Sequence, residues 1–581
     1  MCGIYGITKH DPEFIHNYIQ VCKHRGPDGE KVWWDPDHKI TLGHNLLSIM
    51  ANPKLSIQPW KTPKGNTLVY NGEIFNYYEL KEKYSGKGFA GITGCDTELL
   101  AWGLDKFGLD FLDEIDSMHG FAYYKHKEQE LWISRDHAGI KPLYYAEIED
   151  GLIFGSEVKG LLDKVPGSRQ IDRLAASFQS RTGLNPLRNT LFSGIKKLLP
   201  GETIVWDIAN KKIISTKRIY IKPNSNMKFD PREFKTELAQ AVKRCAIGQR
   251  KIGVFLSGGL DSSVVAYELG KIHDKVYTFT NTFAPTPEPD EHTEDYNSDA
   301  LAAKELVEKE NFQHTEIEIT PKIFKDAWND SVYFGEQPVY TPNSSMYCHT
   351  NKVLADNGIV VTMAGDMGDE IFGGYTKYQH IFERRFKLFK WRDILTLWLN
   401  RLKRPVRLID NILPDDVLIE EFSKCYSKEL WNKKDPTASY MALDCVTQVP
   451  AEFFSRNDKY GMAYGMEGRF PLASKFFMQY CLNIQTRYKI GSGKRDTKLL
   501  TKKAYSRKLP PAILNKSKTG WTVPIGHWLK ANVNKELNDF YNSGIGEGNE
   551  INRVTLNSKV GKSLIPGWAY KSWKEMYKIK Y

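Results

Sequence analysis

The second residue of the chain, Cys2, is a nucleophile that can carry its own base. Removal of Met1, which a small second residue such as cysteine permits, leaves Cys2 with a free α-amine beside its thiol. A thiol has a reference pKa of about 8.5 and an α-amine of about 7.7 to 8.0, so the amine can accept the thiol proton near neutral pH. A Met-Cys start by itself also fits an ordinary processed terminus. The case for catalysis therefore depends on the residues that accompany Cys2.

The pair Asn71-Gly72 offers a side-chain amide and an unhindered backbone N–H, the two kinds of donor that hold a developing oxyanion. In isolation the pair is also typical of a hairpin turn. Other motifs accompany it in order along the chain: HRGPDG at 24–29, YNGEIFN at 70–76, GCDTE at 94–98 and RDHAGIKPLYY at 135–145. With Cys2, these motifs resemble the N-terminal-nucleophile glutamine amidotransferases, in particular the glutaminase half of the asparagine synthetase B family.

The resemblance implies roles for individual residues of the first 212 positions. Cys2 is then the nucleophile, and Asn71 and Gly72 are the oxyanion donors. Glu73 and Asp96 are implied partners of the glutamine α-amine. The whole implied glutamine-binding set is Ser48, Ile49, Asn71, Gly72, Glu73 and Asp96. The implied product of this site is ammonia.

One position departs from the family pattern. The family reads Gly-His-x-Arg-Leu-Ser-Ile, with the arginine on the glutamine carboxylate, where this chain has GHNLLSI at 43–49 and therefore Leu46. A leucine cannot pair with a carboxylate, and the loss of one charge-assisted contact costs about 1.5 to 3 kcal/mol. Three interpretations stay open: weak glutamine use, a different cation such as Arg25 or Lys54, or the use of free ammonia.

A second chemical motif, SGGLDSS at 257–263, follows the apolar run Ile252–Leu256 and precedes a helical pattern. Two glycines allow a sharp turn, and the serine hydroxyls with the N–H groups of a helix start form an anion cradle. No Gly-Lys-Ser/Thr follows, so this is not a Walker loop. It resembles the pyrophosphate loop of enzymes that cleave ATP between the α and β phosphates, such as asparagine, GMP and NAD synthetases and several tRNA-modifying enzymes. The implied ATP-binding residues here are Leu256, Ser257, Gly258, Gly259, Asp261, Ser262 and Ser263.

An acidic element, AGDMGDEIFGGY at 364–375, follows another strand-like run. Magnesium beside a nucleotide prefers oxygen ligands from one or two carboxylates plus phosphates. The family resemblance makes Asp261 and Asp369 the metal ligands and adds Ala364 and Gly365 to the ATP-binding set. Without the resemblance, the same cluster fits a solvated helix start equally well.

The resemblance continues through segments 463–471, 493–500 and 514–524, so it covers nearly the whole chain. It makes Lys498 the first candidate for stabilising charge in the synthetase reaction and Lys494 the second, whereas an isolated lysine on a helix is usually a surface residue. Two departures concern the acceptor: Leu472-Ala473-Ser474 replaces a family Phe-Leu-Asp, and Asn281 replaces an apolar residue. Both loosen the inference that aspartate is the amidated acid.

Short apolar runs separated by Gly, Pro and Asp predict the elements of the N-terminal part. Two amphipathic stretches, 12–23 and 96–107, predict helices that cover antiparallel sheets. We expect a layered α+β glutaminase domain over 1–212 and a linker over 213–230 that begins as an edge strand. The predicted strands are 39–42, 67–70, 120–124, 131–134, 152–155 and 203–206.

From residue 231 the pattern changes to alternating helices and strands, which predicts a parallel α/β sheet with a helical C-terminal part over 231–581. The basic, aromatic stretch Phe382–Arg407 is interpreted as a solvated helical face. The predicted strands are 252–256, 276–280 and 359–363, and the predicted helices are 234–245, 262–272, 299–310 and 345–356.

The composition limits the class of protein. The chain has 581 residues, 41% hydrophobic, 12% aromatic and 26% charged, which is typical of packed domains and too apolar for a disordered chain. A net charge of +11 over this length is a mild excess, so nucleic acid is not an expected partner. The eight cysteines form no CxxC pair, no 18-residue apolar run is present, and the start lacks the order of a secretion signal. We expect a cytoplasmic protein without a membrane partner, and a homodimer is one assembly that we consider.

The sequence thus predicts amidation of aspartate to asparagine with ammonia from glutamine, through an acyl-adenylate, with release of AMP and pyrophosphate. The resemblance implies ATP and Mg²⁺ as cofactors. One alternative is an amidotransferase of the same architecture that acts on another carboxylate, such as a sugar acid or a modified nucleotide. A second alternative is a metabolite-binding homologue without turnover.

Overall fold

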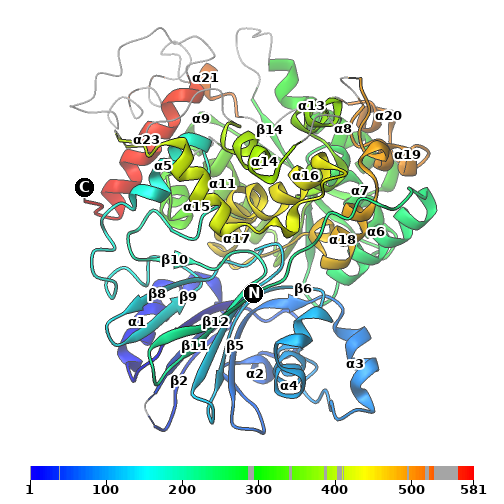
Figure 1. Cartoon of the computed structure of the whole chain (residues 1–581). Helices are drawn as coiled ribbons and strands as arrows, with labels where there is room; N and C mark the ends of the chain where they lie inside the picture. Colours follow the sequence, from blue (N-terminus) through cyan, green and yellow to red (C-terminus); the bar gives the residue numbers. More distant parts are fainter. Residues whose placement is uncertain are drawn as a thin grey trace.

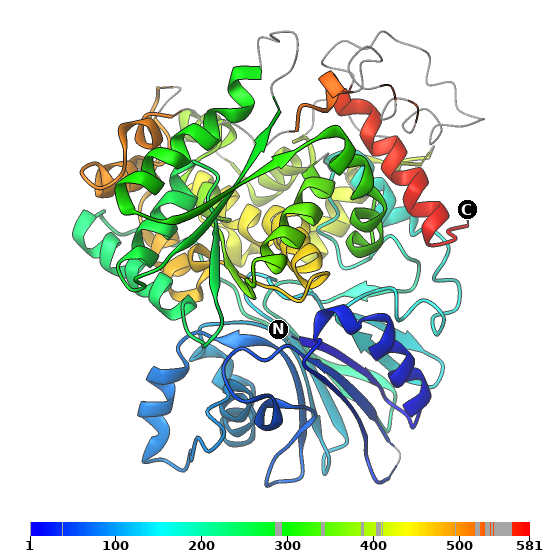
Figure 2. The same ribbon diagram turned by 180° about the vertical axis from the view of Figure 1, so that it is seen from behind.

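The computed structural model describes residues 2–37, 39–284, 293–338, 343–384, 389–401, 408–409, 411–493, 496–516, 523–528, 535, 539 and 561–580. The chain forms an N-terminal part built on two antiparallel sheets and a C-terminal part built on one parallel sheet (Figure 1). The chain's N-terminal end lies between the two parts in both ribbon views (Figures 1 and 2). The strand that starts at Cys2 therefore begins at the junction of the two parts.

The N-terminal part is a sandwich of two six-stranded sheets. Apolar side chains such as Ile4, Leu42, Val69 and Ile133 fill the space between them and are fully buried. The first sheet has the order β10 (Lys196–Lys197), β8 (Tyr144–Ile148), β9 (Gly151–Gly155), β1 (Cys2–Ile7), β3 (Thr41–Leu46) and β2 (Gly29–Trp34). The second has the order β12 (Lys212–Arg218), β11 (Glu202–Asp207), β7 (Glu130–Arg135), β6 (Ser117–Lys125), β5 (Thr67–Ile74) and β4 (Trp60–Lys61).

The described residues up to 212 form five α-helices. The first four lie beside the sandwich, whereas the fifth packs against the helix Asp415–Cys425 of the C-terminal part (Figure 1). The helix α1 packs on β3, where a side chain on Gly43 would collide with Ile15 at 2.4 Å. The helices are α1 (Pro12–Val21), α2 (Pro53–Ser56), α3 (Tyr77–Ser85), α4 (Asp96–Phe107) and α5 (Arg173–Thr182). This arrangement confirms the predicted α+β class, and every predicted strand run coincides with or overlaps an observed strand.

The segment predicted as a linker, 213–230, contributes to both parts. Its first residues lie in β12, the edge strand that pairs with β11, which is the edge strand that its alternating sequence predicted. Its last residue, Asp230, caps helix α6 (Pro231–Cys245) by accepting hydrogen bonds from the N–H groups of Arg232 and Glu233. A side-chain cap followed by proline is a typical helix start.

The C-terminal part contains a five-stranded parallel sheet with the order β15 (Gln313–Ile319), β14 (Tyr277–Phe283), β13 (Ile252–Phe255), β16 (Val361–Met363) and β17 (Glu467–Arg469). The chain order along the sheet reverses between β13 and β16. In parallel sheets, ligands bind beyond the carboxyl ends of strands at such a switch point. The motifs at 257–263 and 364–375 follow these two strands.

Helices surround the parallel sheet (Figure 2). The helices α6 and α7 pack against each other, and α10, α11 and α17 form a second packed group. In the order of the chain the helices are α6, α7 (Leu260–Gly270), α8 (Thr293–Glu310), α9 (Pro321–Asp326), α10 (Trp328–Gly335), α11 (Asn343–Asp356), α12 (Gly368–Phe372), α13 (Thr376–Glu383), α14 (Trp391–Leu399), α15 (Asp415–Cys425), α16 (Pro436–Val446), α17 (Ser455–Met462), α18 (Lys475–Asn483), α19 (Leu499–Tyr505), α20 (Pro511–Leu514), α21 (Ile525–Trp528) and α23 (Gly561–Met576).

The prediction of a solvated face over Phe382–Arg407 is wrong for α14. Trp391, Ile394, Leu395 and Trp398 are buried against neighbouring helices. Their spacing of three and four residues forms one apolar stripe, and that stripe outweighs the basic residues around it.

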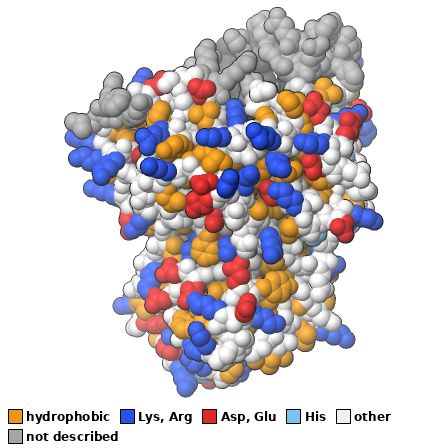
Figure 3. Space-filling model, turned by 90° about the vertical axis from the view of Figure 1, so that its right-hand side faces the viewer, with side chains coloured by type: hydrophobic (Ala, Val, Ile, Leu, Met, Phe, Trp, Pro, Cys, Tyr) orange, Lys and Arg blue, Asp and Glu red, His pale blue; other side chains and the backbone are white. Residues whose placement is uncertain are grey.

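On the face drawn in Figure 3, acidic side chains lie among the basic ones over both parts of the molecule. The excess of positive charge is thus not gathered into one surface on this side. In the described part of the chain, no helix combines the length and apolar character needed to cross a bilayer.

Candidate active sites

Cys2 begins strand β1 and is 7% exposed. Its backbone nitrogen donates a hydrogen bond of 3.1 Å to Oδ1 of Asn71. Burial raises the pKa of the Cys2 thiol, while the positive amino terminus and the N–H of Leu47 act in the opposite direction. A buried thiol therefore needs a nearby base to become a nucleophile, and the α-amine that Met1 removal exposes would be held by Asn71 beside it.

Asn71 and Gly72 lie in the interior of strand β5 and pair with Gly120 and His119 of β6, so they do not form a hairpin turn. With Oδ1 of Asn71 engaged by Cys2, its Nδ2 is buried without a hydrogen-bond partner among the described residues. A side chain on Gly72 would collide with the Met118 carbonyl at 2.2 Å. The buried, unpaired Nδ2 is a donor suited to an oxyanion.

Glu73 and Asp96 line the same cavity as Cys2 and Gly72. Burial raises the pKa of Glu73 well above its ordinary value, the nearby Asp96 adds to this, and Arg469 opposes it. Burial also raises the pKa of Asp96, against hydrogen bonds of 3.0 Å from the Ile74 N–H and the Tyr70 hydroxyl. Two buried carboxylates in one cavity favour the binding of a cation such as the glutamine α-ammonium.

Ser48, Ile49 and Leu46 complete one wall of this cavity, and Leu46 is 3% exposed. Neither alternative cation lines it. Arg25 is fully buried and engaged by Glu157 at 3.0 Å and Asp458 at 2.9 Å, whereas Lys54 is exposed on α2. The departure at Leu46 therefore leaves the cavity wall apolar at this point.

The pyrophosphate-loop motif connects β13 to α7. Gly258 has φ +68°, and a side chain there would lie 1.9 Å from the Asp299 carbonyl, so only glycine fits. The Ser262 hydroxyl lies 3.0 Å from the Ser257 hydroxyl and donates to the Gly259 carbonyl at 3.1 Å. The helix start has no side-chain cap at Gly259. Its first N–H groups thus stay available for an anion.

Lys498 lies between the two expected metal ligands. Its Nζ is 2.5 Å from Asp261 Oδ2 and 2.7 Å from Asp369 Oδ1. Burial alone would lower the pKa of Lys498, but these two carboxylates raise it above its ordinary value. Oxygen donors that already converge on one cation fit Mg²⁺, which takes one or two carboxylates together with phosphate oxygens.

Glycines make room for this arrangement. A side chain on Gly368 would lie 2.3 Å from Cγ of Asp261, and one on Gly374 would lie 1.8 Å from Oδ1 of Asp369. A side chain on Gly365 would lie 2.5 Å from the Ser262 nitrogen. The glycines of the acidic motif are therefore required for the close approach of the two loops.

A cavity of about 440 Å³ opens beside these groups. Of the predicted ATP-binding residues, Leu256, Gly258 and Ser263 do not line it. The predicted residues that line it are Ser257, Gly259, Asp261, Ser262, Ala364, Gly365, Asp369 and Lys498. Lys494 lies outside the described residues.

Seven charged residues that line this cavity were not predicted from the sequence: Asp299, Asp366, Glu370, Glu452, Arg456, Lys502 and Lys516. Burial raises the pKa of Asp366 to about 6, against the Arg456 charge and a hydrogen bond from Asn457. Lys516 forms an ion pair of 2.6 Å with Asp299. Asp366, Glu370 and Lys516 belong to motifs already noted, whereas only packing brings Asp299, Glu452, Arg456 and Lys502 to the cavity.

The two departures in the C-terminal part do not line the cavity. Ser474 Oγ donates to Asp116 at 2.6 Å, and the Ala473 carbonyl lies 2.8 Å from Nε2 of His137, so this segment contacts the N-terminal part. Asn281 accepts a hydrogen bond from Thr350. The inference that these positions concern the acceptor is wrong for Ala473 and Ser474, because they pack at the interface of the two parts.

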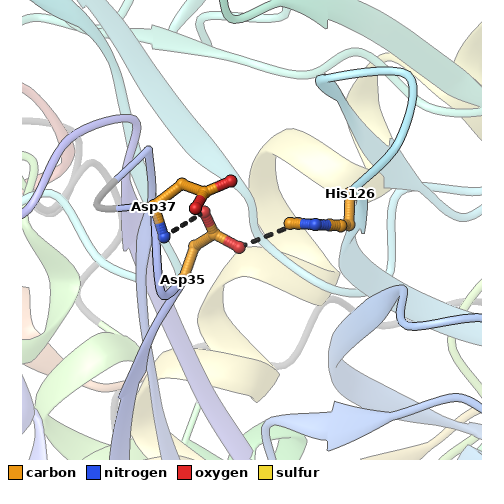
Figure 4. Close-up of side chains that lie close together, drawn as sticks. All are labelled: Asp35, Asp37 and His126. Carbon is orange, nitrogen blue, oxygen red and sulfur yellow. Dashed lines mark hydrogen bonds and ion pairs between the residues drawn. The ribbon is translucent and has the colours of Figure 1, made fainter.

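A third cluster lies at the ends of two sandwich hairpins: Asp35, Asp37 and His126 (Figure 4). Asp35 is buried and accepts hydrogen bonds from the Asp37 N–H at 3.1 Å and, at 3.0 Å, from Nδ1 of His126. Asp37 is exposed. These hydrogen bonds explain the cluster, because they connect the ends of the two hairpins.

A glutamine amidotransferase domain model matches residues 1–220, and an asparagine synthase model matches residues 233–569, more than half of the chain. The chain belongs to the asparagine synthase family. The asparagine synthase match contains the whole parallel sheet and both loops of the 440 Å³ cavity. The amidotransferase match contains Cys2 and the cavity around it.

Relatives in this family match over most of their length. Asparagine synthetase [glutamine-hydrolyzing] 1 of Bacillus subtilis is 26% identical over 92% of this chain and 89% of its own. Asparagine synthetase B [glutamine-hydrolyzing] of Escherichia coli is 25% identical over 91% of this chain and 83% of its own. Among solved structures, the glutamine PRPP amidotransferase of B. subtilis covers 48% of this chain and 65% of its own, with 17% identity and a TM-score of 0.29, which is too low to support an inference.

Proposed function

We propose that the protein hydrolyses glutamine at Cys2 and uses the ammonia to amidate a carboxylate that ATP activates, with aspartate as the first acceptor to test. The observation that carries the proposal is the presence of two separate constellations in one chain. Cys2 and Asn71 form the first, and the group of Asp261, Lys498 and Asp369 forms the second.

In the first half-reaction, the α-amine of Cys2 accepts the thiol proton and the thiolate attacks the glutamine amide carbon. Nδ2 of Asn71 and the N–H of Gly72 stabilise the resulting oxyanion. The amine returns the proton to the leaving nitrogen, which departs as ammonia and leaves a thioester on Cys2. Water then hydrolyses the thioester to glutamate.

In the second half-reaction, the acceptor carboxylate attacks the α-phosphate of ATP, so that an acyl-adenylate forms and pyrophosphate leaves. Asp261 and Asp369 would hold Mg²⁺, which supplies positive charge to the phosphates when it is bound. The N–H groups at the start of α7 and the Lys498 ammonium hold the pyrophosphate. Ammonia then attacks the acyl carbon and displaces AMP.

Asp366 fits the role of proton acceptor in this last step. The attacking nitrogen must lose a proton, and a carboxylate with a pKa of about 6 is mostly ionised at neutral pH while still able to accept one. Asp366 lines the same cavity as Lys498 and the pyrophosphate loop. Arg456, Lys502 and Lys516 line the cavity together with Asp299, Glu370 and Glu452, so groups of both charges are available to bind an acceptor.

The test is a mass-resolved product assay with ATP, magnesium, either glutamine or ammonium, and a panel of acids that includes aspartate and a sugar acid. Aspartate should give asparagine, AMP and pyrophosphate. Amide formation on another acid instead would change the acceptor but keep the reaction. Absence of AMP with every acid would refute the synthetase half, and absence of glutamate release would refute the glutaminase half.

A further inference from the structure

Arg469 comes from β17 of the parallel sheet and reaches into the glutaminase site. Its Nη2 donates a hydrogen bond of 2.9 Å to Oε2 of Glu73, a residue 396 positions away in the chain. Both side chains are buried, at 0% and 3% exposure. The contact joins the C-terminal part directly to a carboxylate that lines the Cys2 cavity.

The rest of the guanidinium is held by its own part of the molecule. Nε donates to Glu467 at 2.6 Å, and Nη1 donates to the carbonyls of Cys245 at 2.7 Å and Ile247 at 2.5 Å. Because the guanidinium is rigid and planar, these contacts at Nε and Nη1 also fix the position of Nη2. Arg469 is thus anchored in the C-terminal part and presents Nη2 to Glu73.

Only one oxygen of Glu73 is used in this contact. Oε1 is buried and has no hydrogen-bond partner among the described residues. Burial and the Asp96 carboxylate raise the pKa of Glu73, whereas Arg469 opposes both. The contact with Arg469 therefore opposes the rise in the pKa of Glu73, and it leaves Oε1 as the unpaired oxygen of a side chain that lines the cavity.

We propose that Arg469 is a positioning residue of the glutamine site: it holds Glu73 in place through Oε2, so that Oε1 receives the α-ammonium of glutamine. This inference rests on the proposed glutaminase function and deepens it. The glutamine site is then complete only when the two parts of the molecule are docked.

The same connection reaches the nucleotide loops. Arg469 pairs with Met363 in the register of β17 and β16, and the Ala364 N–H donates to the Arg469 carbonyl at 3.3 Å. Ala364 lines the 440 Å³ cavity. Arg469 therefore lies between the Cys2 cavity and the loop that follows β16.

The test is a set of steady-state measurements of glutamate release by the full chain. Arg469→Lys keeps the charge but cannot span Glu73, Glu467 and the two carbonyls together. We expect the KM for glutamine to rise about 10-fold or more, the range for loss of a charge-assisted contact, with a much smaller change in kcat. Arg244→Lys is the matched control, because Arg244 forms a two-pronged contact of 2.8 Å with Glu79 across the same interface, outside the cavity. Its KM should stay within about 2-fold of the parent, as for a partly exposed pair.

A double-mutant cycle separates positioning from general support of the fold. If Arg469 acts through Glu73, then Arg469→Lys has no further effect on KM in a Glu73→Gln background. An unchanged KM in the single variant, or equal effects in both backgrounds, would overturn the proposal. Should Arg469→Lys alone not fold, Glu73→Gln should still raise the KM for glutamine about 10-fold or more. An unchanged KM in Glu73→Gln, or a further rise in Glu73→Gln/Arg469→Lys, would overturn the proposal, because the effect would then not pass through Glu73. Failure of the glutaminase function itself is distinct, since the parent would then release no glutamate.

Discussion

The substitution Asn71→Asp removes the proposed oxyanion donor, Nδ2, and keeps the oxygen that accepts the hydrogen bond from the Cys2 nitrogen. The aspartate keeps an oxygen in place of Oδ1, which accepts the 3.1 Å hydrogen bond from the Cys2 nitrogen, but it replaces the unpaired donor Nδ2 by a second acceptor. Loss of one oxyanion donor lowers kcat by about 10² to 10³, or roughly 2.7 to 4 kcal/mol. The new charge beside Glu73 and Asp96 acts in the same direction, because the cavity already holds two buried carboxylates.

The assay compares glutamate release from glutamine with amide formation from ammonium in the same preparation. We expect the first rate to fall by at least about 10² while the second stays near the parent value, since ammonium bypasses Cys2. The ammonium rate is thus an internal control for folding. A glutamine rate within about 3-fold of the parent would show that Nδ2 does not contact the oxyanion, and an equal loss of both rates would show a structural effect instead.

Three further changes test the other groups. Cys2→Ala should abolish glutamine-dependent amidation and spare ammonium-dependent amidation, measured as amide product; loss of both would contradict separate sites. Asp261→Asn should eliminate pyrophosphate release with either nitrogen donor, because the Asp261 and Asp369 pair that suits Mg²⁺ is broken; an unaffected rate would remove its proposed metal role. The pKa of Asp366 is raised to about 6, so below that pH the carboxylate is protonated and cannot act as a base. The ammonium-dependent kcat/KM, calculated per free NH₃, should therefore rise as the pH passes about 6. Asp366→Asn should lower this rate and remove that limb, and a variant that keeps the limb would assign it to another group.

Short-range sequence patterns predicted much of the secondary structure. Helix α4 begins and ends at the predicted residues Asp96 and Phe107, and β13 and α7 flank the glycine-rich loop as expected. These features depend on neighbouring residues: a helix needs a periodic apolar stripe, and Gly258 alone fits its left-handed, crowded turn. The basic residues of Phe382–Arg407 predicted a solvated face, but tertiary packing buries Trp391 and Trp398.

The sequence by itself predicted the candidate nucleophile, the anion-binding loop and the fold class of the N-terminal and C-terminal parts. Each of these features depends on residues that are adjacent or regularly spaced in the chain. The tertiary structure alone placed Lys498 between Asp261 and Asp369, moved Ser474 to the interface, and joined Arg469 to Glu73. Such contacts join residues far apart in the chain, so they depend on how whole strands and helices pack. The spacing of residues in the sequence does not predict that packing, so only the tertiary structure shows that Arg469 of the C-terminal part contacts Glu73 of the N-terminal part.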